Sequence, residues 1–331
     1  MANTTFSGPV RSENGFNLVS KDANTGVVHD RTLSGDAVHD TRRYYLYEAF
    51  KQRPALNAVI NTAFSDADAT AAANTAIRLA EKVANRDFEV LGTNMTTALC
   101  TFNATAAGII LTTAGADADQ AILAPHLDAN QSAWQVTEWG TENQVEWECS
   151  INTNAIDNQK LWAGLKLTND QLVATDANQA FFKFQTDATA SEAFTDFTLL
   201  HFVHSIANTD YISALPITVA ANTIYHLKIT IDSDRKAAIF VDGVQYNVTS
   251  TSGSTGGTAV TTGTTKTAAL TDDIDLIPYI GIEAGDSAAE AVDVHYQAIS
   301  RTICELSTVG VGCRSPAASF YRRLVCQVVQ M

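Results

Sequence analysis

Residues 223–246 read TIYHLKITIDSDRKAAIFVDGVQY, and this stretch decides the fold class. Two apolar-rich runs, 223–231 and 237–241, are joined by a polar turn over residues 232–236. The pair Asp242-Gly243 then opens a third run, and such a pair between two strand-like segments is a strong hairpin signal. The stretch therefore predicts a three-stranded antiparallel meander.

The same two-residue period recurs over residues 88–302, where turn residues separate the apolar runs. In the clearest run, the residues expected on the buried face are Val145, Trp147, Cys149 and Ile151, and those on the opposite face are Glu146 and Glu148. Successive side chains of a strand point to opposite faces of a sheet. We therefore expect a body of many short antiparallel strands, with Trp134, Trp139, Trp147 and Trp162 as core anchors. Exposure of Trp139 to a ligand or neighbour is an alternative for that residue alone.

One stretch inside this body lacks the alternation. Residues 249–268 are a low-complexity run of Ser, Thr and Gly. Such a composition buries too little apolar surface to order itself. We expect a mobile surface loop there.

The two ends of the chain differ from the body. Residues 1–43 contain closely spaced turn residues and too few apolar residues between them for a core, so they are predicted to be an extended arm that needs a host surface. Residues 303–331, with turn residues over 310–316 and a possible last strand over 320–329, are predicted to be a second arm. Residues 44–87 have apolar residues spaced by three or four, broken near Pro54, which predicts a short helical segment. The fold class is thus a mainly β sandwich with a short N-terminal helical segment and two arms.

Charge separates the body from its ends. The chain carries 21 basic and 36 acidic residues, of which residues 44–299 hold 12 and 30. An acidic body of this kind repels nucleic acid. No apolar run approaches a bilayer span, and residues 1–9 lack the basic start and apolar core of a signal peptide. We expect folding in the cytoplasm and no nucleic-acid or membrane partner.

The five cysteines are an odd number without a Cys-x-x-Cys pair. A zinc site is therefore not indicated. Free buried thiols are the favoured interpretation. A disulfide among Cys304, Cys313 and Cys326, formed after release from a reducing cytoplasm, remains an alternative.

The body carries a resemblance to a known fold family. The run Tyr225-His226-Leu227-Lys228-Ile229, the turn Val241-Asp242-Gly243 and the closing strand 292–296 resemble the concanavalin A-like (laminin-G-like) jelly roll. This resemblance implies a two-sheet sandwich.

The opening of the chain carries a second resemblance. Residues 6–16, FSGPVRSENGF, resemble the start of virion structural proteins from marine tailed bacteriophages. The resemblance implies a multimeric capsid decoration protein that assembles in the host cytoplasm and is located on the capsid surface.

Catalysis is an alternative function, because glycan hydrolases share the jelly-roll fold. A retaining glycosidase needs two carboxyl groups about 5 to 5.5 Å apart, and related enzymes present them as E-x-D-x-x-E on one strand. Glu146 and Glu148 share a strand face but lack this motif. We interpret them as a solvated face and expect no catalytic residue.

Metal and cofactor sites are likewise not expected. The acidic runs at residues 117–119, 232–234 and 272–275 do not fit an EF-hand loop and are interpreted as turns. His201 and His204, three apart on a strand, point to opposite faces and so do not form a joint metal site.

The sequence favours a non-enzymatic virion protein over two alternatives, a glycan-binding module for host adsorption and a depolymerase. The expected partners are the phage major capsid protein and sister subunits in a homo-oligomer, with a host glycan as the alternative partner. The residues expected to make the contacts lie in the arms and are Phe6, Val10, Arg11, Phe16, Arg322, Arg323, Leu324 and Val328. An exposed aromatic surface on the body would instead favour glycan binding.

Overall fold

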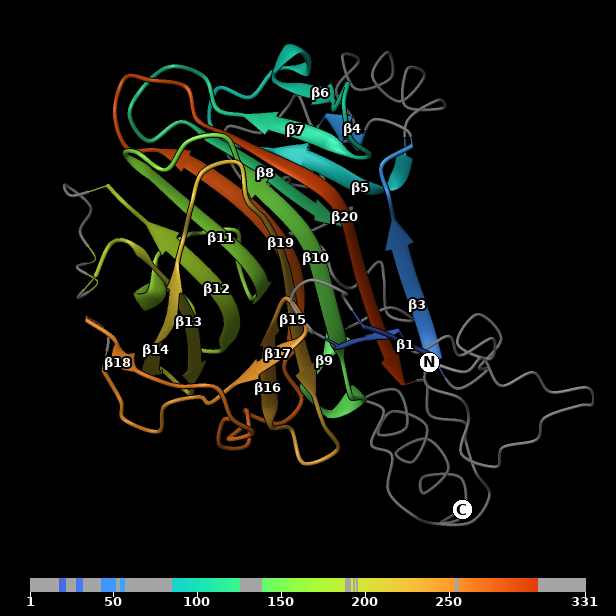
Figure 1. Ribbon diagram of the computed structural model, residues 1–331, viewed down its shortest axis with the longest axis vertical. Helices are drawn as coiled ribbons and strands as arrows, with labels where there is room; N and C mark the ends of the chain where they lie inside the picture. The colour runs from blue at the N-terminus through green and yellow to red at the C-terminus, as the bar shows by residue number, and fades with distance from the viewer. Residues whose placement is uncertain are drawn as a thin grey trace, which may run out of the picture.

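The structure is a computed structural model that describes residues 18–21, 28–31, 43–51, 54–56, 85–125, 139–187, 192, 194, 196–253 and 256–302. These residues form two stacked, mostly antiparallel sheets and one separate hairpin (Figure 1). The predicted mainly β sandwich is therefore confirmed. No helix in the described ranges combines the length and apolar character that a membrane crossing requires.

The first sheet has eight strands. Their order is β17 (Val244–Tyr246), β16 (Ala237–Val241), β15 (Ile224–Ile231), β10 (Glu146–Thr153), β20 (Ala291–Thr302), β7 (Ile109–Thr112) and β6 (Cys100–Phe102), with β3 (Arg43–Glu48) also paired to β20.

The second sheet has ten strands. Their order is β18 (Thr258–Ala259), β14 (Thr209–Thr218), β13 (Leu199–Ile206), β12 (Gln179–Gln185), β11 (Gln159–Lys166), β19 (Asp275–Ala284), β8 (Gln120–Pro125), β5 (Asn85–Leu91) and β4 (Pro54–Leu56), with β9 (Trp139–Gly140) paired to β19. Three short 3-10 turns, η3 (Thr97–Leu99), η5 (Thr141–Asn143) and η6 (Val173–Thr175), interrupt the loops. The hairpin consists of β1 (Leu18–Lys21) and β2 (Val28–Arg31), which pair with each other.

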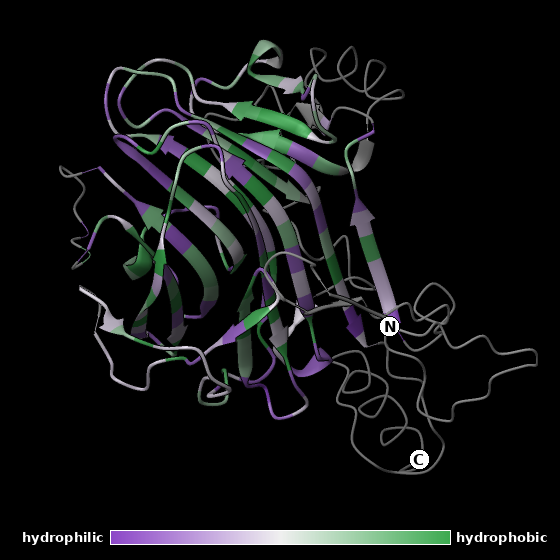
Figure 2. Ribbon diagram, in the orientation of Figure 1, coloured by the Kyte–Doolittle hydropathy of each residue, from purple (hydrophilic) through white to green (hydrophobic). Residues whose placement is uncertain are grey.

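The core lies between the two sheets and follows from the two-residue period. Along β10, Trp147, Cys149 and Ile151 are buried in it, whereas Glu146 and Glu148 lie on the other face. Figure 2 shows this alternation of hydrophobic and hydrophilic residues along the strands of both sheets. The predicted orientation of this strand is confirmed.

The predicted meander is also confirmed. Strands β15, β16 and β17 pair in sequence order. Asp242 and Gly243 have φ angles of 50° and 79°, and positive values at both central residues are those of a type I′ turn. The Asp-Gly pair thus sets the register between β16 and β17.

The predicted helical segment over residues 44–87 is wrong wherever the structure describes it. Residues 43–48, 54–56 and 85–87 belong to strands, and residues 57–84 lie outside the described part. In β3, Leu46 is buried while Tyr45 and Tyr47 are exposed, which is a strand alternation. The apolar and aromatic residues 44–47 fit both the helical period and the two-residue period of a strand. The pairing of β3 with β20 shows that they form a strand.

The prediction of a mobile loop over residues 249–268 is also wrong for the residues that the structure describes, 249–253 and 256–268. The Thr-rich ribbon, residues 247–270, is held by backbone hydrogen bonds of 2.9 Å from Asn247 N to Thr261 O and 3.1 Å from Val248 N to Thr265 O. It also joins both sheet edges, because Val260 N donates to Ala214 O of β14 at 3.0 Å and Gly263 N donates to Gln245 O of β17 at 3.1 Å. Peptide groups paired with edge strands order this ribbon without a core of its own.

Candidate functional site

Each sheet has an outer face, and the two outer faces carry different residues. On the ten-stranded sheet, alternate residues of β11 point away from the core and include Lys160, Trp162 and Lys166. Lys183 on β12 lies on the same face, because it is the cross-strand partner of Trp162. All three lysines are buried, so loops cover this face.

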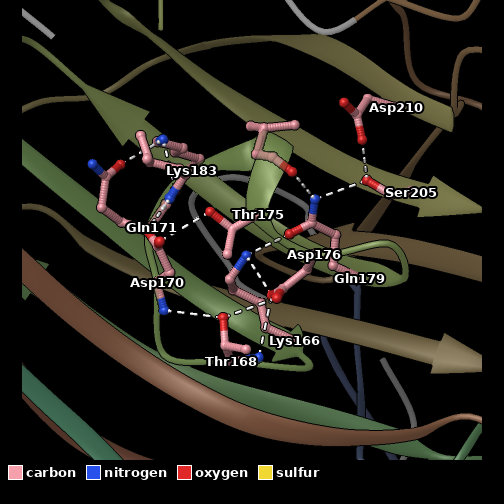
Figure 3. Close-up of polar contacts among 12 residues, drawn as sticks. Lys166, Thr168, Asp170, Gln171, Thr175, Asp176, Gln179, Lys183, Ser205 and Asp210 are labelled. Atoms are coloured by element: carbon pink, nitrogen blue, oxygen red, sulfur yellow. Dashed lines mark hydrogen bonds and ion pairs between the residues drawn. The ribbon is translucent and has the colours of Figure 1, made fainter. Parts of the chain in front are cut away.

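Lys166 forms the centre of a buried polar network on the covered face (Figure 3). Its Nζ lies 3.0 Å from Asp176 Oδ2, and the two side chains are 0% and 1% exposed. The same Nζ donates to Gln179 Oε1, and Gln179 Nε2 donates to Ser205 Oγ at 2.8 Å. Ser205 Oγ in turn donates to Asp210 Oδ1 at 2.6 Å. The network thus links four elements, namely β11, the loop that carries η6, β12 and β13, to the first residues of β14.

The physical effect of this network is to fix the loop over residues 167–178. Thr168 donates its backbone N–H at 3.2 Å and its hydroxyl at 2.8 Å to the Asp176 carboxylate. Burial lowers the pKa of Lys166, and the nearby Asp176 carboxylate opposes that shift. The ion pair is therefore a fully desolvated link between strand and loop.

Lys183 holds a second part of the cover. Its Nζ donates to the backbone O and to Oε1 of Gln171, both at 2.8 Å, and it forms an ion pair with Glu192. Burial lowers the pKa of Lys183 to about 8, and the Glu192 carboxylate limits the shift. Glu192 also accepts a hydrogen bond from Val173 N, so one carboxylate joins two loop segments.

Lys160 is the third buried lysine on the covered face. It pairs with Glu283 on β19 and lies 3.2 Å from Asp187 Oδ2. Burial opposes its charge, but the contacts with Glu283 and Asp187 raise its pKa overall. Each lysine of the covered face therefore has a carboxylate partner, and the arrangement stabilises the covering loops rather than presenting a free amine.

The outer face of the eight-stranded sheet is open to solvent and carries an aromatic row. Tyr45 and Tyr47 on β3 are 49% and 51% exposed, and their parallel rings have centroids 6.4 Å apart. The row continues across β20, where the Tyr296 ring lies 5.8 Å from Tyr47, to His226 on β15 at 6.3 Å. Burial raises the pKa of Tyr296, so its hydroxyl stays protonated at neutral pH. We call these four side chains the tyrosine row.

Glu146 and Glu148 lie beside the tyrosine row, on the open face. Their side chains are 45% and 38% exposed, and both approach Lys228 Nζ, at 3.3 and 3.9 Å. Arg43 Nη2 is 3.6 Å from the Glu146 carboxylate. The predicted solvated face is confirmed, since both carboxylates are partly exposed and share the nearby cations.

Other residues singled out from the sequence have structural roles. His201 and His204 lie on opposite faces of β13, as predicted, because His201 contacts Phe194 whereas His204 stacks on Tyr211. Trp139 is a core residue as predicted, because it is 7% exposed and packs on Tyr44, and the alternative of an exposed Trp139 is wrong. Trp147 and Trp162 are buried as predicted, and Trp134 lies outside the described residues.

The acidic runs lie in turns and loops, where their carboxylates accept hydrogen bonds or form ion pairs. Asp232 accepts backbone hydrogen bonds from Asp234 and Lys236, and Asp119 accepts one from Ala116. Asp272 pairs with Arg235 at 3.4 Å. In the described part of the chain, no three His, Cys, Asp or Glu side chains are arranged to hold a metal ion.

A small cavity lies between the two sheets. Its volume is about 10 Å³, and its lining includes Leu161, Phe184 and Leu227. This space is about enough for one water molecule. It is a packing defect of the core and does not serve as a ligand pocket.

The arm residues predicted to make contacts, from Phe6 to Phe16 and from Arg322 to Val328, lie outside the described residues, as do the three C-terminal cysteines. What the structure adds is where the arms begin. Arg43, the first residue of β3, is the register partner of Thr302, the last residue of β20, and its Nη1 donates to Thr302 Oγ1 at 3.3 Å. Nothing in the sequence pattern indicates this meeting, because 258 residues separate the two positions.

No family model and no curated protein matches the chain. Among solved structures, the chain is similar to a protein of unknown function from Shewanella oneidensis MR-1, with a TM-score of 0.46 and 10% identity over 82% of this chain and 91% of that chain. It is also similar to peanut lectin (TM-score 0.41, 10% identity, 80% and 99%) and to a family 16 glycosyl hydrolase protein from Mycobacterium smegmatis (0.40, 8%, 77% and 98%). The two-sheet fold follows from the pairing and register of the chain's own strands.

Proposed function

We propose that this chain is a structural protein of a tailed bacteriophage particle, displayed on the capsid surface and held there by its two terminal arms. The observation that carries the proposal is the pairing of Arg43 with Thr302. Residues 1–42 and 303–331 both continue from this one point, and we infer from their common origin that both contact the same partner surface. Two linked contacts bind more tightly than either alone, because the first raises the effective concentration of the second.

The charge distribution supports this arrangement. Residues 44–299 carry most of the acidic excess, whereas the two ends are neutral to basic. A body with a large net charge stays soluble and repels its neighbours, which suits the solvent-facing side of a particle. The arms then contact the major capsid protein or sister subunits, and the body carries out no chemistry.

The resemblance of residues 6–16 to virion proteins of marine phages supports the choice of particle. The test is to purify particles of the phage that encodes the chain and to count its copies by quantitative mass spectrometry. Deletion of residues 303–331 should lower the copy number several-fold, and deletion of both arms should abolish incorporation. A matched control is Lys266→Ala in the exposed Thr-rich ribbon, which should leave incorporation unchanged.

Two outcomes would contradict the proposal. The first is absence of the chain from purified particles. The second is full incorporation of the variant that lacks both arms, since the body would then carry its own attachment site.

A second candidate function, glycan binding, is favoured by the tyrosine row. Tyr45 and Tyr47 are half exposed and lie beside carboxylate and cationic side chains. Exposed aromatic rings flanked by hydrogen-bonding groups suit sugars, which have both apolar and polar surfaces. The nearby positive charges of Arg43 and Lys228 are balanced by the carboxylates of Glu146 and Glu148, which favours a neutral glycan.

A glycan array with the full chain tests this candidate. Tyr45→Ala/Tyr47→Ala should weaken any binding about tenfold or more, which corresponds to about 1.4 kcal/mol or more. Phe102→Ala removes a similarly exposed aromatic ring from β6 and is the matched control. Failure of the full chain to bind any glycan on the array would remove this candidate.

A further inference from the structure

The edges of the two sheets differ in how they are protected. At one side, the Thr-rich ribbon pairs with β14 through β18 and with β17 through a bridge between Tyr246 and Thr262. At the other side, β6 and β4 are only three residues long, and β4 begins with a proline. Short strands and prolines are the usual protection of a sheet edge.

β3 lacks all of these protections. It is six residues long, and among the described strands it pairs with β20 alone. Its sequence, RYYLYE, has no proline, glycine or lysine, and its charges stand only at the two ends. Tyr45 and Tyr47 are half exposed on the outer face, where a neighbouring strand would supply cross-strand partners for them. The edge of β3 is therefore built to accept another strand.

The β1–β2 hairpin has the complementary requirement. In the described structure its two strands pair only with each other. A lone two-stranded hairpin is marginally stable in water and gains from addition to a larger sheet. Eleven residues separate the end of the hairpin at Arg31 from the start of β3 at Arg43, and among the described residues the hairpin is not paired to the β3 edge.

We propose that the free edge of β3 binds the β1–β2 hairpin of a second copy of this chain, by strand addition. The exchange is reciprocal, so it closes as a symmetric dimer in which each copy donates one hairpin and accepts one. The proposal deepens the arm-mediated docking proposed above and rests on it, since it names the sister subunit as a partner of the N-terminal arm.

Complementation between two variants tests the proposal. Deletion of residues 1–42 removes the hairpin and keeps the edge. Tyr45→Lys/Tyr47→Lys places cations along the edge, as natural edge strands do, and keeps the hairpin. By analytical ultracentrifugation the full chain should dimerise, each variant alone should show a dissociation constant raised about tenfold or more, and the mixture should form a 1:1 heterodimer.

Controls separate loss of the interface from loss of the fold. Tyr45→Phe/Tyr47→Phe keeps the apolar cross-strand contacts and should dimerise as the full chain does. If the lysine variant does not fold, a synthetic peptide of residues 17–32 replaces it and should dissociate the full-length dimer. Hydrogen exchange should show the β3 amides that do not donate to β20 protected in the dimer and unprotected after deletion of residues 1–42.

The proposal is overturned if the full chain is monomeric, if the lysine variant dimerises normally, or if the mixture forms no heterodimer. Protection of β3 in a monomer would show that a chain's own hairpin fills the edge, and this too overturns it. None of these results affects the docking proposal itself, because incorporation into particles is measured separately.

Discussion

The outer faces of the two sheets lie on the same sandwich but have opposite surroundings. On the ten-stranded sheet, Lys166 and Lys183 are buried under loops whose carboxylates neutralise them. On the eight-stranded sheet, Tyr45 and Tyr47 project into solvent beside half-exposed ion pairs. The comparison teaches that charge on the covered face stabilises the fold, whereas charge and aromatic surface on the open face remain available for a partner.

The largest expected effect comes from breaking a buried pair on the covered face. Asp176→Asn leaves Lys166 buried without its counter-charge, which should cost about 3–5 kcal/mol of unfolding free energy. The measurement is chemical denaturation at pH 7. The double variant Lys166→Met/Asp176→Leu removes both charges and should be far closer to the wild type, because a well-packed apolar pair replaces the ions. If Asp176→Asn is as stable as the wild type, the interpretation of Lys166 and Asp176 as a desolvated ion pair is wrong.

Acid sensitivity is the next largest expected effect, and it separates the buried histidines from the exposed one. Burial lowers the pKa of His204 to about 3 and that of His201 to about 4. Between pH 6.5 and 4.5 the unfolded chain therefore binds protons that the folded chain does not, so stability is present above pH 6.5 and falls as the pH drops. His204→Phe should reduce the loss of unfolding free energy between pH 6.5 and 4.5 by about 2–3 kcal/mol.

Thermal unfolding at pH 7 and pH 4.5 measures the effect of His204→Phe. His226 on the open face is exposed, so His226→Phe is the matched control and should leave the pH dependence unchanged. An equal loss of stability in wild type and His204→Phe on acidification would show that His204 is accessible to protons in the folded state.

The sequence predicted the fold well where one face of a strand is apolar and the other polar. In β10 the alternation of Trp147 with Glu146 and Glu148 identified both the strand and its orientation. In β3, four successive apolar or aromatic residues fit a helix or a strand equally, and only the pairing with β20 decides. Edge position is a tertiary property that local periodicity does not contain.

The candidate sites were harder to predict for the same reason. The carboxylate partners of Lys166 and Lys183 lie 10 and 9 residues away along the chain, and these spacings predict no contact until the loops fold back over the sheet. The tyrosine row draws Tyr47, Tyr296 and His226 from three distant segments. The Thr-rich ribbon was judged by side-chain composition, although backbone hydrogen bonds order it.

Packing gives a smaller effect that is confined to the covered face. At Gly281 an added Cβ would lie 2.2 Å from Cζ2 of the Trp162 ring, so Gly281→Ala forces the buried indole to move. Overpacking of this kind costs about 1–3 kcal/mol, read from the denaturation midpoint. Gly115 is the control, because its nearest neighbour would be 3.8 Å away, and Gly115→Ala should change stability by less than about 0.5 kcal/mol. Equal effects at both positions would contradict the tight packing of Trp162.

The smallest effect is expected for an ion pair on the open face. Glu146 lies 3.3 Å from Lys228 and 3.6 Å from Arg43, but its side chain is almost half exposed, and water and salt screen both contacts. Glu146→Gln should therefore cost between about 0 and 1 kcal/mol, measured as for Asp176→Asn, and 0.5 M salt should abolish the difference. A cost near that of Asp176→Asn would mean that this face is covered in solution.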